Sequence, residues 1–177
     1  MYFLNVYKEK GMTSFDVIHK LRKILNIKKI GHSGTLDPLA QGVLQVAVGN
    51  ASRLLEYLDD DKEYIAQIKF GYTSATEDEE GEKTFIKKPD FSKDELLQAL
   101  NLFKGKISQI PPKYSAIKVN GKKLCDLSRQ NKELPEIKPR EVEIYQIKLL
   151  NFIAPDSAEI LVHCSKEIGR ASCRERV

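Results

Sequence analysis

The chain has 177 residues, of which 41% are hydrophobic and 31% are charged. This length suits one domain, and the composition is that of a globular protein, which excludes a disordered chain. No apolar run approaches the ~20 residues of a membrane span, and the N-terminus lacks the basic leader of a signal peptide. The three cysteines have no C-x-x-C spacing, which argues against a disulfide framework or a zinc ribbon. We therefore expect a cytoplasmic protein that makes no membrane contact.

The net charge of +4 is mild, but the basic residues gather in two clusters, at 20–29 and 113–129. Acidic residues gather at 59–61 and 77–82, and we interpret both acidic runs as solvated. Each basic cluster has two interpretations, a solvated face or a contact with the backbone of a nucleic acid.

The first part of the chain predicts a strand followed by a helix. Residues 2–7 have the pattern of a short strand, and Thr13 with Asp16 has the spacing of a capping box. Apolar residues then recur at helical spacing, so one helix face should be buried, whereas the basic residues should face outward. The expected buried positions are Val17, Ile18, Leu21, Ile24 and Leu25.

The segment 30–42 contains three glycines and a proline, which predicts a loop. A buried strand is expected at 43–48, a short helix at 51–58 and a half-buried strand at 64–70. These strands are predicted because apolar residues run together in the first and alternate in the second. The polar stretch 71–83 predicts another loop.

The second half predicts a further capped helix and several strands. Ser92 and Glu95 form a capping-box pattern before a helix with an apolar face. Asn120-Gly121 predicts a hairpin turn, and a change of face near Ile144 predicts a β-bulge. Because strands outnumber helices without strictly alternating with them, the fold class is α+β, with a mixed, largely antiparallel sheet and flanking helices. The remaining expectations are strands at 107–110, 142–149 and 158–164, and a helix face of Leu96, Leu97, Leu100 and Phe103.

The loop at 31–42 is the candidate site, because it holds His32, Ser33, Thr35 and Asp37 between glycines. From composition alone, Asp37 before a proline is more typical of a turn than of a catalytic carboxylate. A phosphate-binding loop is excluded because the segment has no lysine, and a nucleophile elbow because Thr35 replaces the second glycine of that motif. The histidines lack zinc-ligand spacing, so no metal is expected.

Five blocks of the sequence, in order, resemble the bacterial tRNA pseudouridine synthases that isomerise a uridine in the T-arm loop of tRNA, the TruB type. The block at 31–44, GHSGTLDPLAQGVL, is similar to the catalytic motif of that family. The resemblance implies the catalytic fold of pseudouridine synthases and extends from residue 1 to about residue 166. The other similar blocks lie at 8–14, 62–64, 71–78 and 109–124.

The resemblance implies roles for three residues. Asp37 matches the catalytic aspartate, whose carboxylate works in a dry pocket and needs no cofactor and no metal. Whether this carboxylate attacks the sugar, attacks the base or removes a proton is left open. His32 is expected to fill the space of the everted nucleotide, and Tyr64 to pack on the flipped base. Tyr64 also fits a core position of its strand.

The substrate implied by the resemblance is the T-arm stem-loop of a tRNA, bound by an enzyme that is monomeric when its catalytic domain is complete. The basic clusters then favour contacts with the RNA backbone, which give affinity but carry no sequence information. The candidate residues for these contacts are Lys20, Arg22, Lys23 and Lys123.

The chain departs from the family after Lys166. The family continues with Gly-Thr-Tyr-Ile-Arg, whose arginine pairs with the catalytic carboxylate, but here residues 167–177 are EIGRASCRERV. We expect an incomplete catalytic domain at 1–166 and a non-family tail, foreign or misread, at 167–177. Two functions are therefore open: a tRNA pseudouridine synthase, or a catalytically dead RNA-binding or RNA-folding module.

Overall fold

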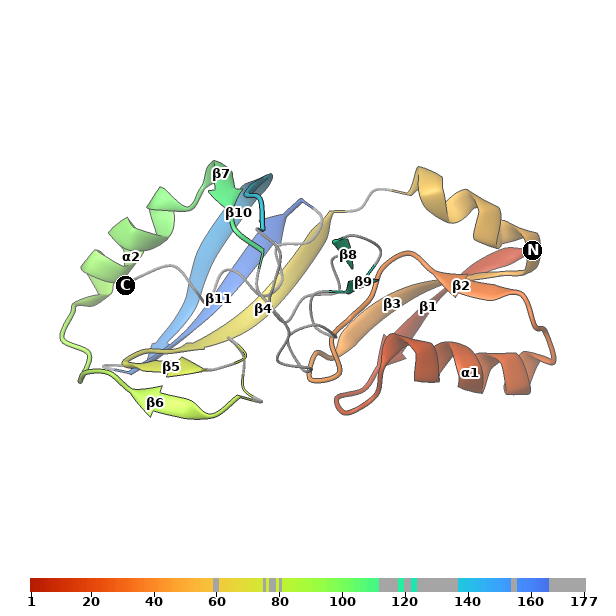
Figure 1. The fold of residues 1–177 in the computed structure, drawn as a ribbon, viewed down its shortest axis with the longest axis horizontal. Coiled ribbons are helices and arrows are strands. Elements are labelled where there is room, and N and C mark those ends of the chain that lie inside the picture. The colour runs from red at the N-terminus through yellow and green to blue at the C-terminus, as the bar shows by residue number, and fades with distance from the viewer. Residues whose placement is uncertain are drawn as a thin grey trace. The chain divides into compact units, whose positions relative to one another are not determined.

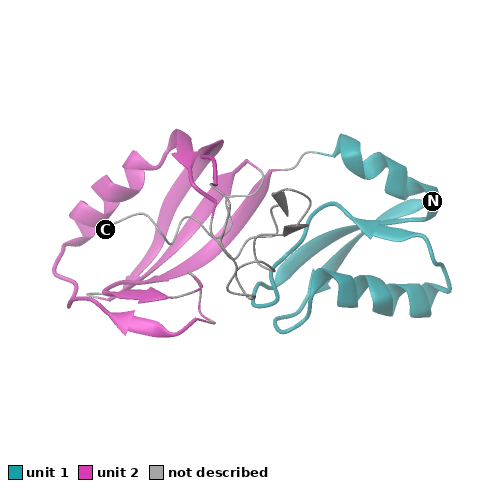
Figure 2. Cartoon of the chain, viewed as in Figure 1, with its two compact units in different colours: residues 1–60 teal, residues 61–177 magenta. Residues whose placement is uncertain are grey.

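The chain divides into two compact units, Met1–Asp60 and Asp61–Val177, which are described separately below (Figure 2). The computed structural model describes residues 1–58, 61–74, 76, 79, 81–111, 118–119, 122–123, 137–153 and 156–165. The predicted catalytic domain at 1–166 includes residues of both units and stays a prediction. The tail at 167–177 lies outside the described residues.

Unit 1 is a three-stranded antiparallel sheet with a helix packed on it (Figure 1). The central strand pairs on both sides, in the order β1-β3-β2. Apolar side chains of the helix α1 and of all three strands form the core of this unit. The elements are β1 (Tyr2–Lys8), α1 (Ser14–Leu25), β2 (Ile30–His32), β3 (Gly42–Val48) and the 3₁₀ helix η1 (Gly49–Tyr57).

Helix α1 begins and ends as its sequence predicts. Thr13 is the N-cap, and the reciprocal bonds between Thr13 and Asp16 complete the capping box. The helix ends at Asn26, which adopts the left-handed conformation with φ 52°. One predicted core position is wrong, because Ile24 is 76% exposed. At 3.6 residues per turn, Ile24 lies about a quarter turn from the centre of the buried stripe.

The segment that was predicted as one loop, 30–42, begins with a strand. Residues 30–32 form β2, which pairs with β3 from Ile30 opposite Val48 to His32 opposite Val46. Three residues are too few for their alternation to be recognised in the sequence. Strand β3 itself is confirmed, although Val43 at its start is 63% exposed.

Unit 2 is a four-stranded antiparallel sheet in the order β4-β11-β10-β7, with the helix α2 packed against it. The α2 capping box of Ser92 and Glu95 is confirmed. Its buried residues Leu96 and Leu100 pack on the sheet, whereas Leu97 is exposed. The elements are β4 (Lys62–Lys69), β5 (Tyr72–Ser74), β6 (Lys83–Phe85), α2 (Lys93–Leu102), β7 (Gly105–Gln109), β10 (Arg140–Ile153) and β11 (Ser157–Cys164).

Three features of unit 2 bear on sequence predictions. The register of β10 against β11 shifts between Ile144 and Gln146, so the predicted bulge is confirmed and Tyr145 is the extra residue. The stretch 71–83, predicted as a loop, contributes to a small hairpin of β5 and β6. The hairpin that Asn120-Gly121 predicts is present as β8 (Lys118–Val119) paired with β9 (Lys122–Lys123), and its turn residues lie outside the described ones.

The predicted fold class is confirmed, since the structure is α+β and every strand pair in its described part is antiparallel. In the same part of the chain, no helix has the length and apolar character that crossing a membrane requires.

The core of unit 2 offers a paired test of side-chain burial. Ile160 of β11 is 1% exposed, whereas Ile65 of the neighbouring strand β4 is 66% exposed and lies on the opposite face of the sheet. Ile160→Ala should lower the free energy of unfolding by about 2–5 kcal/mol, because it leaves a cavity. Ile65→Ala should lower it by less than about 1 kcal/mol. Urea denaturation of both variants checks this, and equal losses would contradict the assigned burial.

Candidate functional site

The candidate site is the loop of residues 33–41 that connects β2 to β3 and carries Asp37. The first residue of the loop, Ser33, is held to β3, because its N–H donates to the carbonyl of Gln45 at 3.0 Å. The Ala40 N–H donates to the Asp37 carbonyl at 3.0 Å, so Asp37 does begin a turn, as an aspartate before a proline predicts. The turn does not exclude a catalytic role, because it uses the backbone of Asp37 and not its carboxylate.

A buried serine fixes the backbone immediately before Asp37. Ser14, in the first turn of α1, is 2% exposed. Its Oγ accepts a hydrogen bond from Leu36 N–H at 2.9 Å and donates one to the Leu36 carbonyl at 3.2 Å. Both polar backbone groups of Leu36 are thereby bound to one side chain, so the peptide that precedes Asp37 is held in one orientation.

A buried lysine and a backbone amide fix the residue immediately after Asp37. The Gly11 N–H donates to the Pro38 carbonyl at 2.8 Å. Lys8 is 0% exposed, and its Nζ donates to the carbonyls of Met12 at 2.7 Å, Glu9 at 3.1 Å and Pro38 at 3.4 Å. Both neighbours of Asp37 in the sequence are therefore hydrogen-bonded to other segments. Leu36 is bound by α1, and Pro38 is bound by β1 and by the turn that follows β1.

The charges of Lys8 and Asp37 interact. Burial lowers the pKa of the Lys8 ammonium from its ordinary value, and the negative charge of Asp37 opposes this by raising it. The Asp37 side chain itself is exposed. The groups described above brace its neighbours along the backbone, and the dry pocket that the family resemblance implied stays a prediction.

His32 lies on β2, at the start of the same loop. Its Nδ1 lies 2.7 Å from the Gly34 carbonyl. A carbonyl oxygen only accepts, so Nδ1 carries the proton and Nε2 of a neutral ring remains an acceptor. The structure thus places His32 at the end of β2 and Asp37 in the loop that follows it, both in unit 1.

Tyr64 lies in unit 2, on β4 opposite Val162 of β11. It is partly buried and packs against the hydrophobic core of that unit, which confirms the core position that its strand pattern predicted. A role in stacking on a flipped base stays a prediction.

The basic candidates of α1 differ from one another. Lys20 and Lys23 are exposed, as predicted. Arg22 is partly buried, its Nη2 donates to the Ile30 carbonyl at 3.3 Å, and its guanidinium lies 5.6 Å from the centre of the Phe15 ring. The outward orientation that we predicted for Arg22 is therefore wrong, because the long side chain folds back along the helix and reaches β2. The side chain of Lys123 lies outside the described residues.

Sequence reasoning missed the bracing role of Lys8 and Ser14, although both lie in the block at 8–14 that resembles the family. A signal was present for Lys8, because it follows Leu4 and Val6 at alternate positions of β1 and so falls on the buried face. A metal site has no candidate in the described residues, where no three His, Cys, Asp or Glu side chains gather.

The bracing by Lys8 predicts a loss of stability when its ammonium is removed. Lys8→Met keeps the length of the side chain but leaves the Met12 carbonyl without this donor. The free energy of unfolding should fall by about 1–3 kcal/mol, the usual cost of an unsatisfied buried polar group. Lys28→Met, at an exposed position of the same unit, is the matched control and should change it little. Equal urea midpoints for the two variants would contradict the bracing role.

Comparison with known proteins identifies the family. Residues 22–168 match the TruB family pseudouridylate synthase (N terminal domain). The tRNA pseudouridine synthase B of Listeria monocytogenes is 50% identical over 148 residues, which are 82% of this chain and 48% of the relative. That of Staphylococcus aureus is 50% identical over 155 residues, 84% of this chain and 51% of the relative. The chain thus spans about half the length of the curated relatives it matches.

Solved structures show the same relationship at lower identity. A Cbf5-Nop10-Gar1 complex contains a chain that is 28% identical, with a TM-score of 0.69 over 97% of this chain and 42% of that one. An H/ACA RNP bound to a substrate RNA containing 2'-deoxyuridine gives 25% identity and a TM-score of 0.66, over 97% of this chain and 40% of the other. With its matched residues, its relatives and its fold in agreement, the chain belongs to the TruB family of pseudouridylate synthases.

Proposed function

We propose that this chain is the catalytic part of a tRNA pseudouridine synthase, which isomerises a uridine in the T-arm loop of tRNA. The observation that carries the proposal is the bracing of Asp37, whose neighbours Leu36 and Pro38 are bound by the buried side chains of Ser14 and Lys8. A reacting carboxylate needs such a fixed backbone, because a misplacement of about 1 Å is enough to slow catalysis strongly.

The proposed reaction requires a positioned carboxylate and no redox partner. The bond between the ribose C1' and the uracil N1 breaks, the uracil turns, and a new bond forms between C1' and C5. The proton that C5 loses is balanced by the proton that N1 gains. The Asp37 carboxylate can assist by attacking the sugar, by attacking the base or by removing a proton, and its place in the loop is compatible with each of these. The reaction needs no cofactor and no metal.

His32 and Tyr64 are proposed to handle the base. Uracil must leave its stack before it can react, at a cost of a few kcal/mol. The His32 ring, held by its bond to Gly34, is suited to fill the vacated space and to offer Nε2 as an acceptor. Tyr64 is suited to pack on the everted base while part of its ring remains in the core of unit 2.

Basic side chains are proposed to bind the RNA backbone. Lys20 and Lys23 are exposed on α1 and suit this role. The intramolecular contacts of Arg22 favour a mainly structural role for it, and Lys123 remains a candidate from its sequence alone. We also infer a cytoplasmic enzyme, because its proposed substrate is a tRNA, and one that is monomeric when its catalytic domain is complete.

The second function, a catalytically dead RNA-binding or RNA-folding module, is favoured by one observation. Residues 167–177, EIGRASCRERV, differ from the Gly-Thr-Tyr-Ile-Arg block that the family resemblance implied at this point. A turnover assay of the 177-residue chain on a T-arm stem-loop distinguishes the two functions, since only the enzyme forms pseudouridine.

Asp37 should be essential for turnover and dispensable for binding. The test uses a fusion of residues 1–166 with the C-terminal half of the Listeria monocytogenes relative, so that the family sequence is complete. Asp37→Asn keeps the size of the side chain but removes its charge. Pseudouridine formation should fall below detection, while the Kd for tRNA should stay within about tenfold, or ~1.4 kcal/mol. Retained turnover would contradict the catalytic assignment of Asp37.

His32 and Tyr64 should affect base eversion more than bond chemistry. In the same fusion, Tyr64→Leu and His32→Ala should slow turnover without abolishing it, because stacking on an aromatic ring contributes about 1–3 kcal/mol per base. A substrate whose target uridine is already unpaired and unstacked should partly restore the rate of His32→Ala. Failure of this rescue would assign His32 to the chemistry or to holding the loop.

A further inference from the structure

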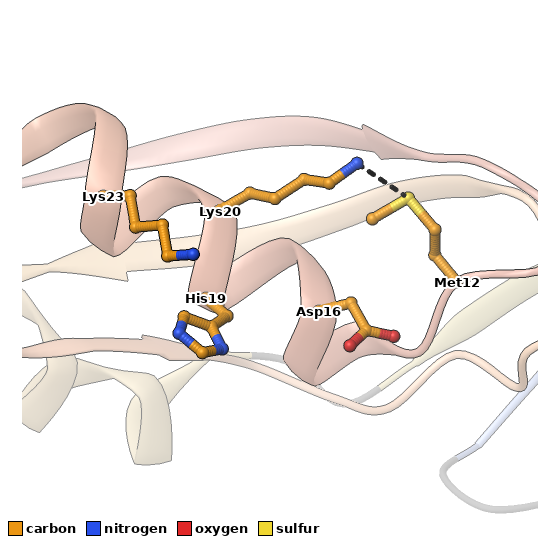
Figure 3. Close-up of a pocket in the computed structure, with 5 residues that line it drawn as sticks. All are labelled: Met12, Asp16, His19, Lys20 and Lys23. Atoms are coloured by element: carbon orange, nitrogen blue, oxygen red, sulfur yellow. Dashed lines mark hydrogen bonds between the residues drawn. The ribbon is translucent and has the colours of Figure 1, made fainter.

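The exposed side of α1 carries a hollow. Its volume is about 310 Å³, and five side chains line it (Figure 3). Four come from α1, and the fifth comes from the turn before the helix. They are Met12, Asp16, His19, Lys20 and Lys23.

The two lysines of this hollow are available to a ligand. Neither hollow lysine forms an ion pair with a carboxylate in the described part of the chain, where the ion pairs include Lys69–Asp156 and Lys106–Glu141. The Lys20 Nζ contacts only the Met12 sulfur at 3.7 Å, a weak acceptor (Figure 3). Both ammonium groups therefore keep donors free for an anion.

The acidic residue of the hollow is already engaged. Asp16 Oδ2 accepts hydrogen bonds from Thr13 N–H at 2.8 Å and from the Thr13 hydroxyl at 2.6 Å. These bonds lower the pKa of Asp16, and the charges of His19 and Lys20 contribute to this. The carboxylate serves the N-cap of α1, and two ammonium groups against one carboxylate leave the hollow with an excess of positive charge.

We propose that this hollow binds one phosphodiester group of an RNA, and that Lys20 and Lys23 share it. Residues three apart on a helix are neighbours, with about 5–6 Å between their Cβ atoms, so two lysines can each donate to a different oxygen of one phosphate. His19, at the rim, supplies a further donor or a ring surface for the adjoining nucleotide. The proposal rests on the proposed function, because it takes the bound RNA to be the substrate.

The hollow lies on the same helix as a residue that braces the site, but on another face of it. Ser14, which binds Leu36 next to Asp37, is on the same helix. At a rise of 1.5 Å per residue, Lys20 and Lys23 stand about 9–14 Å further along the helix axis than Ser14. At 3.6 residues per turn the two lysines point away from the buried face that holds Ser14, so the phosphate that they bind belongs to RNA passing the exposed side of α1.

A double-mutant cycle on the 177-residue chain tests whether the phosphate is shared. The Kd for a labelled T-arm stem-loop is measured at several salt concentrations for the parent, Lys20→Ala, Lys23→Ala and the double variant. Lys93→Ala, at an exposed helix position of unit 2 outside both basic clusters, is the matched control. The variants change only exposed side chains, and far-ultraviolet circular dichroism checks that they fold.

One shared phosphate predicts a specific pattern of salt dependence. The double variant should lose about 0.7–0.9 from the slope of log K against log salt, the value for one phosphate. Each single variant should lose less than half of that, since the other lysine still neutralises the group. An additive loss of about 1.4–1.8, twice that value, would overturn the sharing. An unchanged slope would overturn the site but not the proposed function, whereas a parent that does not bind the RNA would overturn both.

Two further arms identify the source of the phosphate and test the parent chain directly. Inorganic phosphate is compared with chloride at the same ionic strength. Phosphate should displace no more RNA than chloride does, and greater displacement by phosphate would assign the hollow to a free anion.

Acetylation of lysines, followed by mass spectrometry, should show Lys20 and Lys23 at least fivefold protected by bound RNA while Lys93 is not. Equal labelling of all three with and without RNA would overturn the proposal.

Discussion

The burial of the Lys8 ammonium is the constraint on which the site of unit 1 depends. An ammonium group without solvent must have its donors bound, and here backbone carbonyls accept them. Those carbonyls belong to the turn after β1 and to Pro38. The hydrogen bonds of one ammonium group therefore hold together two segments that are far apart in the sequence. The position of Asp37 follows from this, because it is the residue before Pro38.

Helix α1 connects this constraint to the rest of unit 1. Its capping box fixes where the helix begins, and the first helical residue, Ser14, then faces the loop and binds Leu36. Its buried stripe packs on the sheet, while its exposed side holds the two lysines of the hollow. One helix thus fixes the loop before Asp37 and presents positive charge at its surface, and each task uses a different face.

Several residues serve structure and proposed chemistry together. Tyr64 belongs to the packed face of β4, which holds its ring in place for the contact with a base that we propose. Arg22 is the reverse case. Its charge predicted a contact with RNA, but its side chain reaches β2 and lies over the Phe15 ring. Charge alone does not distinguish these uses, because the long side chain of arginine can either extend into solvent or fold back on its own helix.

The sequence by itself determined the local elements and the family. Both capping boxes, the bulge at Tyr145 and the strands with clear alternation follow from residue types at short spacing, where the physical cause lies within a few residues. Asp37 became a candidate through the resemblance of its block to the family motif, since its residue types alone favoured a turn. Only the tertiary structure decided that β2 is a strand, that Arg22 turns inward, that Asp37 is exposed and that Lys8 and Ser14 hold the loop. These depend on contacts between residues up to 30 positions apart, and periodicity carries no information about such contacts.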